Sequence, residues 1–237
     1  MSAVINMIYK NTLRGRFIDR PNRFIAHVEI GGRSETVHVK NTGRCRELLL
    51  PDAEVILQKS DDPKRKTKYD LIAVKKKNLG WVNIDSQAPN KVVLEWLKTL
   101  DFDLIKPEFC YGDSRLDFYL ERGNEKWLVE VKGCTLEIDG RGYFPDAKSE
   151  RAARHMRELE KALGEGYRCA AAFIIAMEGV DTVQPNTERD PDFAAAFEKA
   201  VSAGVEVWNL RCTVTETELK IKNTAVEGRR AIGINRF

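Results

Sequence analysis

Asp117, Glu130 and Lys132 are the residues whose types and spacing are most typical of a catalytic site. Two carboxylates that face each other are destabilising unless a positive charge lies between them, and a bound divalent cation supplies that charge. Oxygen ligands suit Mg²⁺ or Mn²⁺ better than zinc. Lys132 beside such a metal would orient a water molecule or stabilise negative charge on a phosphate. We therefore expect Asp117 and Glu130 to bind the metal and all three residues to form the catalytic group of a phosphodiester hydrolase.

The relative position of these residues follows from a predicted hairpin. Gly123-Asn124 is a two-residue turn signal between two alternating segments, 116–120 and 127–132. A hairpin centred there makes two cross-strand pairs of opposite charge, Arg122 with Glu125 and Glu121 with Lys126. The same register places Asp117 directly opposite Glu130, with Lys132 on that face. The alternative is that Glu130 and Lys132 form an ordinary ion pair on a solvated face.

The second half of the chain alternates strands and helices, which is typical of an α/β domain. Besides the hairpin, the pattern predicts a buried strand at 170–177 and another strand at 205–210. Helices are predicted at 92–100, 146–163 and 192–203. Residues 88–90 read Ala-Pro-Asn and interrupt the preceding pattern, so we place a domain boundary there and expect domains at 1–88 and 89–222 and a tail at 223–237.

The first half predicts a small β-barrel. Alternating segments indicate five strands, and a short helix of one or two turns is expected after residue 44. The predicted strands are 23–30, 34–40, 54–59, 69–75 and 81–85. Five strands with one short helix suit an OB-like Greek-key barrel, a fold that often binds nucleic acid.

Basic residues are concentrated in this first half. Residues 1–90 hold 17 Lys and Arg against 10 Asp and Glu, whereas residues 91–237 hold 22 against 26. We expect Arg16, Arg20, Arg23 and Arg44 to contact DNA phosphates. In the segment Asn41-Thr42-Gly43-Arg44, the alternative is a helix cap made by Asn41 or Thr42, which leaves Arg44 free for a phosphate.

The helix over 146–163 offers further candidates. A step of 100° per residue aligns Lys148, Arg151 and His155 beside its buried face, where they would overlook Glu130. We expect Arg151 and His155 to join the DNA-binding surface. Asp146 most simply caps this helix. Glu95, on the preceding helix, is a minor candidate for a further metal ligand.

Composition excludes several other classes of protein. The five cysteines are scattered and form no C-x-x-C pair, so a zinc knuckle or a disulfide framework is not expected. No segment approaches the ~20 apolar residues of a membrane span, and the first residues do not resemble a signal peptide. We expect a cytoplasmic protein without membrane contact.

Several motifs together resemble the sugar fermentation stimulation protein A family. They are Arg20-Pro21-Asn22-Arg23-Phe24, the segment 38–44, Ser114-Arg115-Leu116-Asp117-Phe118, Glu130-Val131-Lys132, Phe144-Pro145-Asp146-Ala147, and Arg151 with His155. The resemblance implies an N-terminal OB-fold, a PD-(D/E)XK nuclease-like αβββαβ core, DNA binding and a role in regulating sugar metabolism. This chain departs from the family pattern at Ala152 and Arg154, where the family has glycine and lysine.

The leading hypothesis is a double-stranded DNA-binding protein, largely indifferent to sequence, with a Mg²⁺ or Mn²⁺ site that hydrolyses phosphodiesters. A second hypothesis keeps the DNA binding but makes the nuclease-like domain a catalytically silent scaffold of a transcriptional regulator. A third replaces DNA with RNA or another anionic ligand, which an OB-like barrel would also accept. A homodimer is compatible with each of them.

Overall fold

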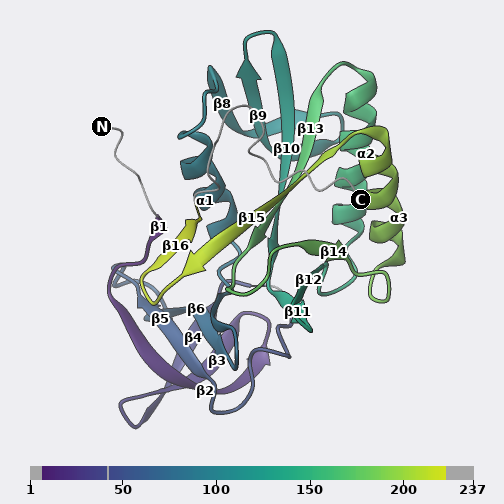
Figure 1. The fold of residues 1–237 in the computed structure, drawn as a ribbon. Coiled ribbons are helices and arrows are strands. Elements are labelled where there is room, and N and C mark those ends of the chain that lie inside the picture. The colour runs from purple at the N-terminus through teal and green to yellow at the C-terminus, as the bar shows by residue number, and fades with distance from the viewer. Residues whose placement is uncertain (1–6, 42, 223–237) are drawn as a thin grey trace.

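A closed β-barrel is followed along the chain by a layered α/β domain in the computed structural model, which describes residues 7–41 and 43–222. The barrel strands lie at the bottom of Figure 1, and the larger sheet with its helices lies above them. Thr42 and the predicted tail at 223–237 lie outside the described residues.

Five strands close the barrel: β2 (Thr12–Asn22), β3 (Ile25–Ile30), β4 (Arg33–Val39), β5 (Glu54–Lys59) and β6 (Tyr69–Lys76). They pair in the order β4-β3-β2-β5-β6, and a parallel pairing of β4 with β6 completes the ring. A short strand, β7 (Gly80–Asn83), adds to the outer side of β6. The alternation seen in the sequence fills the interior, because Ala26, Val28, Val37 and Val39 are buried. The expected OB-like barrel is confirmed.

One expectation for the barrel needs correction. The first predicted strand, 23–30, is β3, whereas β2 before it was not predicted, because most of its residues are exposed or half-buried and show no alternation. The short helix of one or two turns that was expected after residue 44 is present as a single turn, in which the Leu49 N–H donates to the Cys45 carbonyl. Burial of Cys45, Leu48 and Leu49 holds this turn against the barrel.

A seven-stranded sheet forms the centre of the second domain, in the order β1-β16-β15-β13-β10-β9-β8. Its strands are β8 (Leu104–Tyr111), β9 (Ser114–Arg122), β10 (Glu125–Cys134), β13 (Arg168–Ile175), β15 (Glu206–Val214), β16 (Glu218–Ile221) and β1 (Met7–Ile8). β10, β13 and β15 run parallel. Although β1 precedes the barrel in the chain, it pairs with β16 and so belongs to this second sheet.

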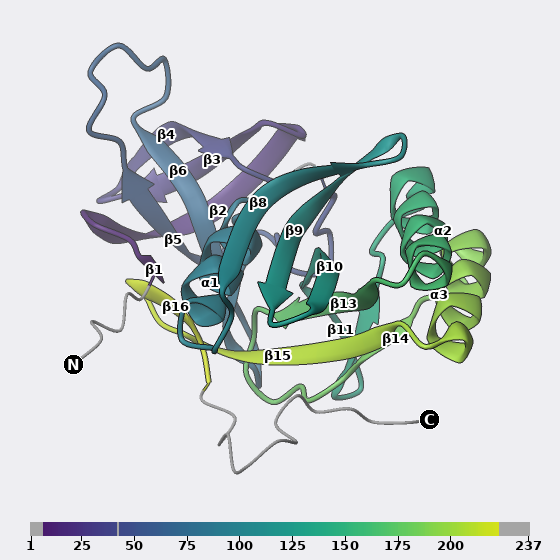
Figure 2. The same ribbon diagram turned by 90° about the horizontal axis from the view of Figure 1, so that it is seen from above.

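Three helices cover both faces of this sheet: α1 (Ala88–Leu97), α2 (Glu150–Gly164) and α3 (Pro191–Ala203). Alternate residues of β13 divide between the two faces, since Phe173 packs in the core that includes α2 and α3 while Ala172 packs in the core that includes α1. Figure 2 shows α2 and α3 side by side, away from α1. The order α1, β8, β9, β10, α2, β13 matches the expected αβββαβ core.

Besides β1, β2 and β16, four further short or exposed strands were not expected from the sequence pattern. β8 carries Pro107 and is largely exposed at the sheet edge, so its sequence does not alternate clearly. β11 (Leu136–Ile138), β12 (Arg141–Phe144) and β14 (Val183–Pro185) form a separate small sheet. In the described residues, no helix is both long enough and apolar enough to cross a membrane.

The barrel docks directly on the second domain. The Asn83 N–H donates to the Ala176 carbonyl at 2.9 Å. The Lys76 ammonium donates to the carbonyl of Glu137 at 3.0 Å and pairs with its carboxylate. These bonds join the end of β7 to the segment that follows β13, and the end of β6 to β11.

Candidate metal centre and nucleic-acid interface

The hairpin has the register expected from its turn. Five directly opposed pairs join β9 and β10, from Arg122 with Glu125 to Phe118 with Val129. This register continues to Asp117 and Glu130, as expected, but the ladder itself ends one pair earlier. The cause is the Asp117 side chain, whose Oδ2 accepts the Val131 N–H at 2.7 Å and takes the place of a backbone partner.

Asp117 is held by two hydrogen bonds on its two oxygens. Besides the bond from Val131, Oδ1 accepts from Nδ2 of Asn90, at the start of α1, at 2.7 Å. Burial and the nearby negative charge of Glu130 raise the pKa of Asp117 above its usual range, despite these donors. Asp117 and Glu130 therefore lie close enough to repel each other, as the metal hypothesis requires.

Glu130 is almost fully buried, with 2% of its surface exposed. Its Oε1 accepts from the Lys132 ammonium at 2.5 Å and from His155 Nδ1. Burial alone would raise the pKa of Glu130, but Lys132 and His155 outweigh it and hold the pKa below its usual range. Among the described residues, Oε2 is buried and has no hydrogen-bond partner. An ionised, buried carboxylate with one oxygen unsatisfied is suited to bind a cation.

Helix α2 delivers His155 to this carboxylate. Arg151, one turn earlier, donates from Nε to His155 Nε2 at 3.4 Å, and a guanidinium can only donate. His155 Nε2 is therefore the acceptor, and Nδ1 carries the proton that it donates to Glu130. The sequence placed His155 correctly beside Glu130. Only 1% of its surface is exposed, however, so it supports the Glu130 carboxylate and does not contact DNA at the surface.

The start of α2 differs from the prediction. Ser149, not Asp146, is the N-cap, and its Oγ accepts the Ala152 N–H at 3.2 Å. Asp146 instead approaches the barrel, because a Cβ added to Gly43 would lie 2.6 Å from its Oδ2. Gly43 thus allows a loop of the barrel and the segment before α2 to meet closely.

The minor expectation that Glu95 of α1 reaches the metal site is wrong, and Asn90 of the same helix lies there instead. Glu95 lies near Met7 and Glu218, where burial raises its pKa. Asn90 is the residue of α1 that reaches Asp117. Sequence reasoning missed Asn90, and its position directly after Pro89, which starts the helix, is the only local signal that its side chain projects from the helix start.

The four barrel arginines occupy two kinds of position. Arg20 donates to the carbonyls of Arg23, Asn41, Gly43 and Arg44, so it holds together the loop that follows β4. Arg16, Arg23 and Arg44 are exposed. Arg23 lies over the exposed ring of Phe24, with its guanidinium carbon 5.0 Å from the ring centre. Arg16, although exposed, donates to the Asp52 carbonyl at 3.3 Å, and the Arg20 guanidinium is engaged in the loop.

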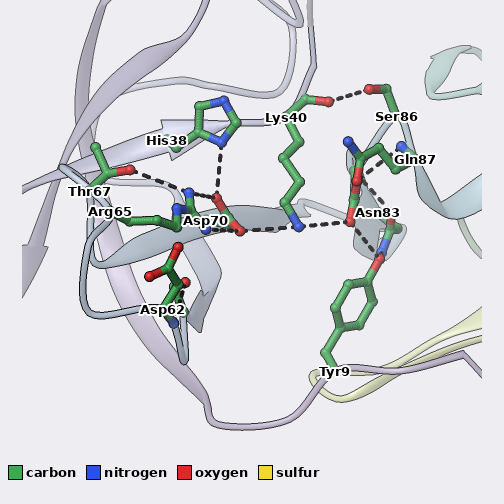
Figure 3. Close-up of polar contacts among 12 residues, drawn as sticks. Tyr9, His38, Lys40, Asp62, Arg65, Thr67, Asp70, Asn83, Ser86 and Gln87 are labelled. Atoms are coloured by element: carbon green, nitrogen blue, oxygen red, sulfur yellow. Dashed lines mark hydrogen bonds and ion pairs between the residues drawn. The ribbon is translucent and has the colours of Figure 1, made fainter.

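A polar network links residues of the barrel to the segment that precedes α1, and Figure 3 shows its contacts. The Lys40 ammonium lies 3.1 Å from Asp70 and 3.6 Å from Asp85, and both carboxylates are buried. Arg65 and His38 also bond to Asp70. Burial would raise the pKa of Asp70, but Arg65, His38 and Lys40 lower it far below its usual range. The network orders the segment that precedes α1 and therefore Asn90.

Comparisons with known proteins cover nearly the whole chain. The family model described as the sugar fermentation stimulation protein RE domain matches residues 87–218, and the model described as the SfsA N-terminal OB domain matches residues 18–84. The sugar fermentation stimulation protein homolog of Clostridium beijerinckii is 48% identical over 92% of this chain and 97% of its own length. That of Desulfitobacterium hafniense strain Y51 is 49% identical over 90% and 95%. The structure of Pyrococcus furiosus SfsA in complex with Ca²⁺ is similar with a TM-score of 0.80, at 28% identity, over 92% of this chain and 96% of that one.

Proposed function

Because the chain belongs to the sugar fermentation stimulation protein family, with its OB and RE domains, we propose that it is a DNA-binding protein whose second domain hydrolyses phosphodiesters with a divalent metal. The observation that carries this proposal is the buried Oε2 of Glu130, which has no hydrogen-bond partner among the described residues. A second carboxylate, that of Asp117, lies close enough to repel it. A divalent cation would satisfy both carboxylates at once.

Glu130 and Asp117 are the residues that would hold Mg²⁺ or Mn²⁺. The donor set fits, because carboxylate oxygens are the ligands these ions prefer. The relative from Pyrococcus furiosus was solved in complex with Ca²⁺, another cation that binds oxygen ligands, which supports the proposal for this chain. When bound, such an ion polarises a phosphoryl oxygen and lowers the pKa of water.

The protein's own residues would position the reacting groups. Lys132, beside Glu130, orients the attacking water and stabilises negative charge that develops on the phosphate. His155 fixes the orientation of the Glu130 carboxylate, and Asn90 does the same for Asp117. The attack breaks the phosphorus–oxygen bond of the leaving group, which takes up a proton, and yields a phosphate monoester and a free hydroxyl.

Binding to double-stranded DNA would rest mainly on the basic barrel. Arg16, Arg23 and Arg44 are exposed there, and contacts from such side chains to the phosphate backbone carry little sequence preference. Arg151 is exposed on α2, one turn from His155, and would extend this contact towards the metal centre. Homodimer formation, a cytoplasmic location and a role in sugar metabolism stay predictions.

A second candidate function is a DNA-binding regulator with a silent nuclease-like domain. Two observations favour it. Lys132 and His155 both occupy Oε1 of Glu130, and in residues 7–41 and 43–222 no group of three His, Cys, Asp or Glu side chains is arranged to hold a metal. In this case the two carboxylates would bind a metal weakly or would only stabilise the fold.

Cleavage of supercoiled plasmid in Mg²⁺, Mn²⁺ and Ca²⁺ separates the two functions. We expect the wild type to nick plasmid in at least one metal and Lys132→Ala to lose about a hundredfold or more in rate with unchanged DNA affinity. Lys126→Ala is the matched control, because Lys126 is an exposed lysine on the same strand. Absence of wild-type cleavage in every metal supports the silent regulator, and cleavage that survives both Lys132→Ala and Glu130→Ala reveals a different active site or a contaminant.

A further inference from the structure

A cavity of about 130 Å³ lies between the barrel and the second domain. The barrel side contributes Asn41 and the segment from Asn83 to Ser86. The other side contributes Gly133, Tyr143 and Asp146, together with residues of α1, β11 and β12 and the residue that follows β13. Neither domain alone encloses the cavity, so its shape depends on their docking.

Two residues that line the cavity are direct chain neighbours of residues at the candidate metal centre. Gly133, which lines it, directly follows Lys132 in β10. Pro89, which also lines it, directly precedes Asn90, the residue that bonds to Asp117. A Cβ on Gly133 would lie 3.0 Å from Cγ of Pro89, so the two walls meet. A phosphate bound at Asp117 and Glu130 would therefore place an adjoining part of its strand at this cavity.

The size of the cavity selects the group that can enter. An engineered protein cavity of ~150 Å³ accommodates one benzene molecule. A cavity of about 130 Å³ is thus suited to one six-membered ring and too small for a fused purine without rearrangement. Pro89, Tyr143 and Phe144 give it apolar and aromatic walls, which favour a flat ring.

Asp146 supplies a hydrogen-bond acceptor at the wall. Its carboxylate lies against Gly43, and no donor to that carboxylate is found among the described residues. Its negative charge contributes to raising the pKa of the Cys45 and Cys134 thiols to about 12, after the larger effect of their burial. The charge therefore lies close to both domains. A carboxylate in this position favours a ring with an amino group and repels a ring with a carbonyl at the same position.

On the opposite wall, the polar side chains already have hydrogen-bond or ion-pair partners within the protein. Oδ1 of Asp85 accepts the Gln87 N–H at 3.0 Å, and the Asp85 carboxylate pairs with Lys40. Asn83 donates to the Tyr9 hydroxyl at 2.9 Å (Figure 3). Asp146 is thus the acidic residue of the cavity whose hydrogen-bonding capacity is left for a ligand.

We propose that this cavity binds one unpaired cytosine base of a nucleic acid strand whose phosphate lies at Asp117 and Glu130. Asp146 accepts a hydrogen bond from the exocyclic amino group, and Tyr143, Phe144 and Pro89 contact the ring. This inference rests on the proposed function, because the neighbouring phosphate brings the base to the cavity. It adds a base preference and a requirement for an unpaired nucleotide at that position.

The test compares single-stranded deoxythymidine oligonucleotides that carry one central cytosine, uracil or abasic site. Affinities are measured with the full chain in Ca²⁺, with gel analysis to confirm that the strands stay intact. We expect the cytosine strand to bind about tenfold more tightly than the other two. Asp146→Ala should remove this difference and leave the affinity for the uracil strand unchanged. Asp113→Ala, which replaces an exposed aspartate, is the matched control and should keep the preference.

If the wild-type protein binds the three oligonucleotides with equal affinity, the inference is overturned, and this result does not depend on the folding of any variant. A preference that survives Asp146→Ala in a folded protein would also overturn it. Free deoxycytidine that binds as tightly as the strand would assign the cavity to a nucleoside and reject its link to the metal centre. Failure of the proposed function is separate, because it appears as loss of metal binding or of all nucleic acid binding.

Discussion

His155 Nδ1 donates a hydrogen bond to Oε1 of Glu130, and both side chains are buried. The bond joins α2 to the central strand β10 and fixes one oxygen of the carboxylate, so the other oxygen projects without a partner. This arrangement is typical of a carboxylate that is positioned by a neighbouring residue for a ligand. His155 therefore orients the Glu130 carboxylate and, being buried, does not form the DNA contact expected from its sequence position.

His155→Ala should weaken Mn²⁺ binding by about tenfold to a hundredfold, because the Glu130 carboxylate loses the donor that orients it. The measurement is calorimetric titration with Mn²⁺, and metal-free DNA affinity should stay unchanged. Arg151→Ala, which removes only the outer hydrogen bond to His155, is the control and should have a smaller effect on Mn²⁺ affinity. Equal Mn²⁺ affinity in wild type and His155→Ala would reject the positioning role.

Arg20→Ala should lower the free energy of unfolding by about 1–3 kcal/mol, because it leaves the carbonyls of the loop that follows β4 without their donor. Thermal unfolding measures this loss. Arg44→Ala is the control and should leave the melting temperature nearly unchanged. A stable Arg20→Ala protein would show that the loop does not depend on this guanidinium.

Arg44→Ala should weaken binding to all DNA sequences similarly and reduce the slope of log affinity against log salt by about one, as expected for one lost phosphate contact. Fluorescence anisotropy at several salt concentrations gives both quantities. An effect confined to one DNA sequence would contradict a phosphate contact.

Asp70 should make the fold sensitive to acid. Its pKa is far below the unfolded value of about 3.9, so the unfolded state binds the proton more readily and stability is lost as the pH falls below about 4. Asp70→Asn should cost about 3 kcal/mol at pH 7, because Arg65 and Lys40 lose their common partner, and should flatten this acid dependence. Urea unfolding from pH 7 to pH 3 measures both effects. Parallel pH profiles for the two proteins would contradict the assignment.

The parts of the fold that follow local rules were predictable from the sequence. The turn at Gly123-Asn124 fixed the hairpin register, and the apolar segment after Arg168 was recognisable as a strand buried on both faces. The edge strand β8 and the arginine-rich β2 were not, because exposed strands need not alternate.

The candidate site likewise contains residues that local patterns predicted and residues that they did not. Glu130, Lys132 and His155 were brought together from a strand period and a helix period. Asn90 and the unengaged carboxylate of Asp146 depend on how α1 and the barrel dock on β10, and no local pattern encodes that contact. The bonds from Arg20 to the Gly43 and Arg44 carbonyls likewise join segments far apart in the chain, so the sequence could not show that this guanidinium is engaged.

Anomalous diffraction from crystals soaked in Mn²⁺ tests the central claim most directly. We predict one strong peak within bonding distance of Oε2 of Glu130 and of the Asp117 carboxylate, and its loss in Glu130→Ala crystals. A peak elsewhere, or no peak at a concentration that supports plasmid cleavage, would show that these two carboxylates are not the metal centre.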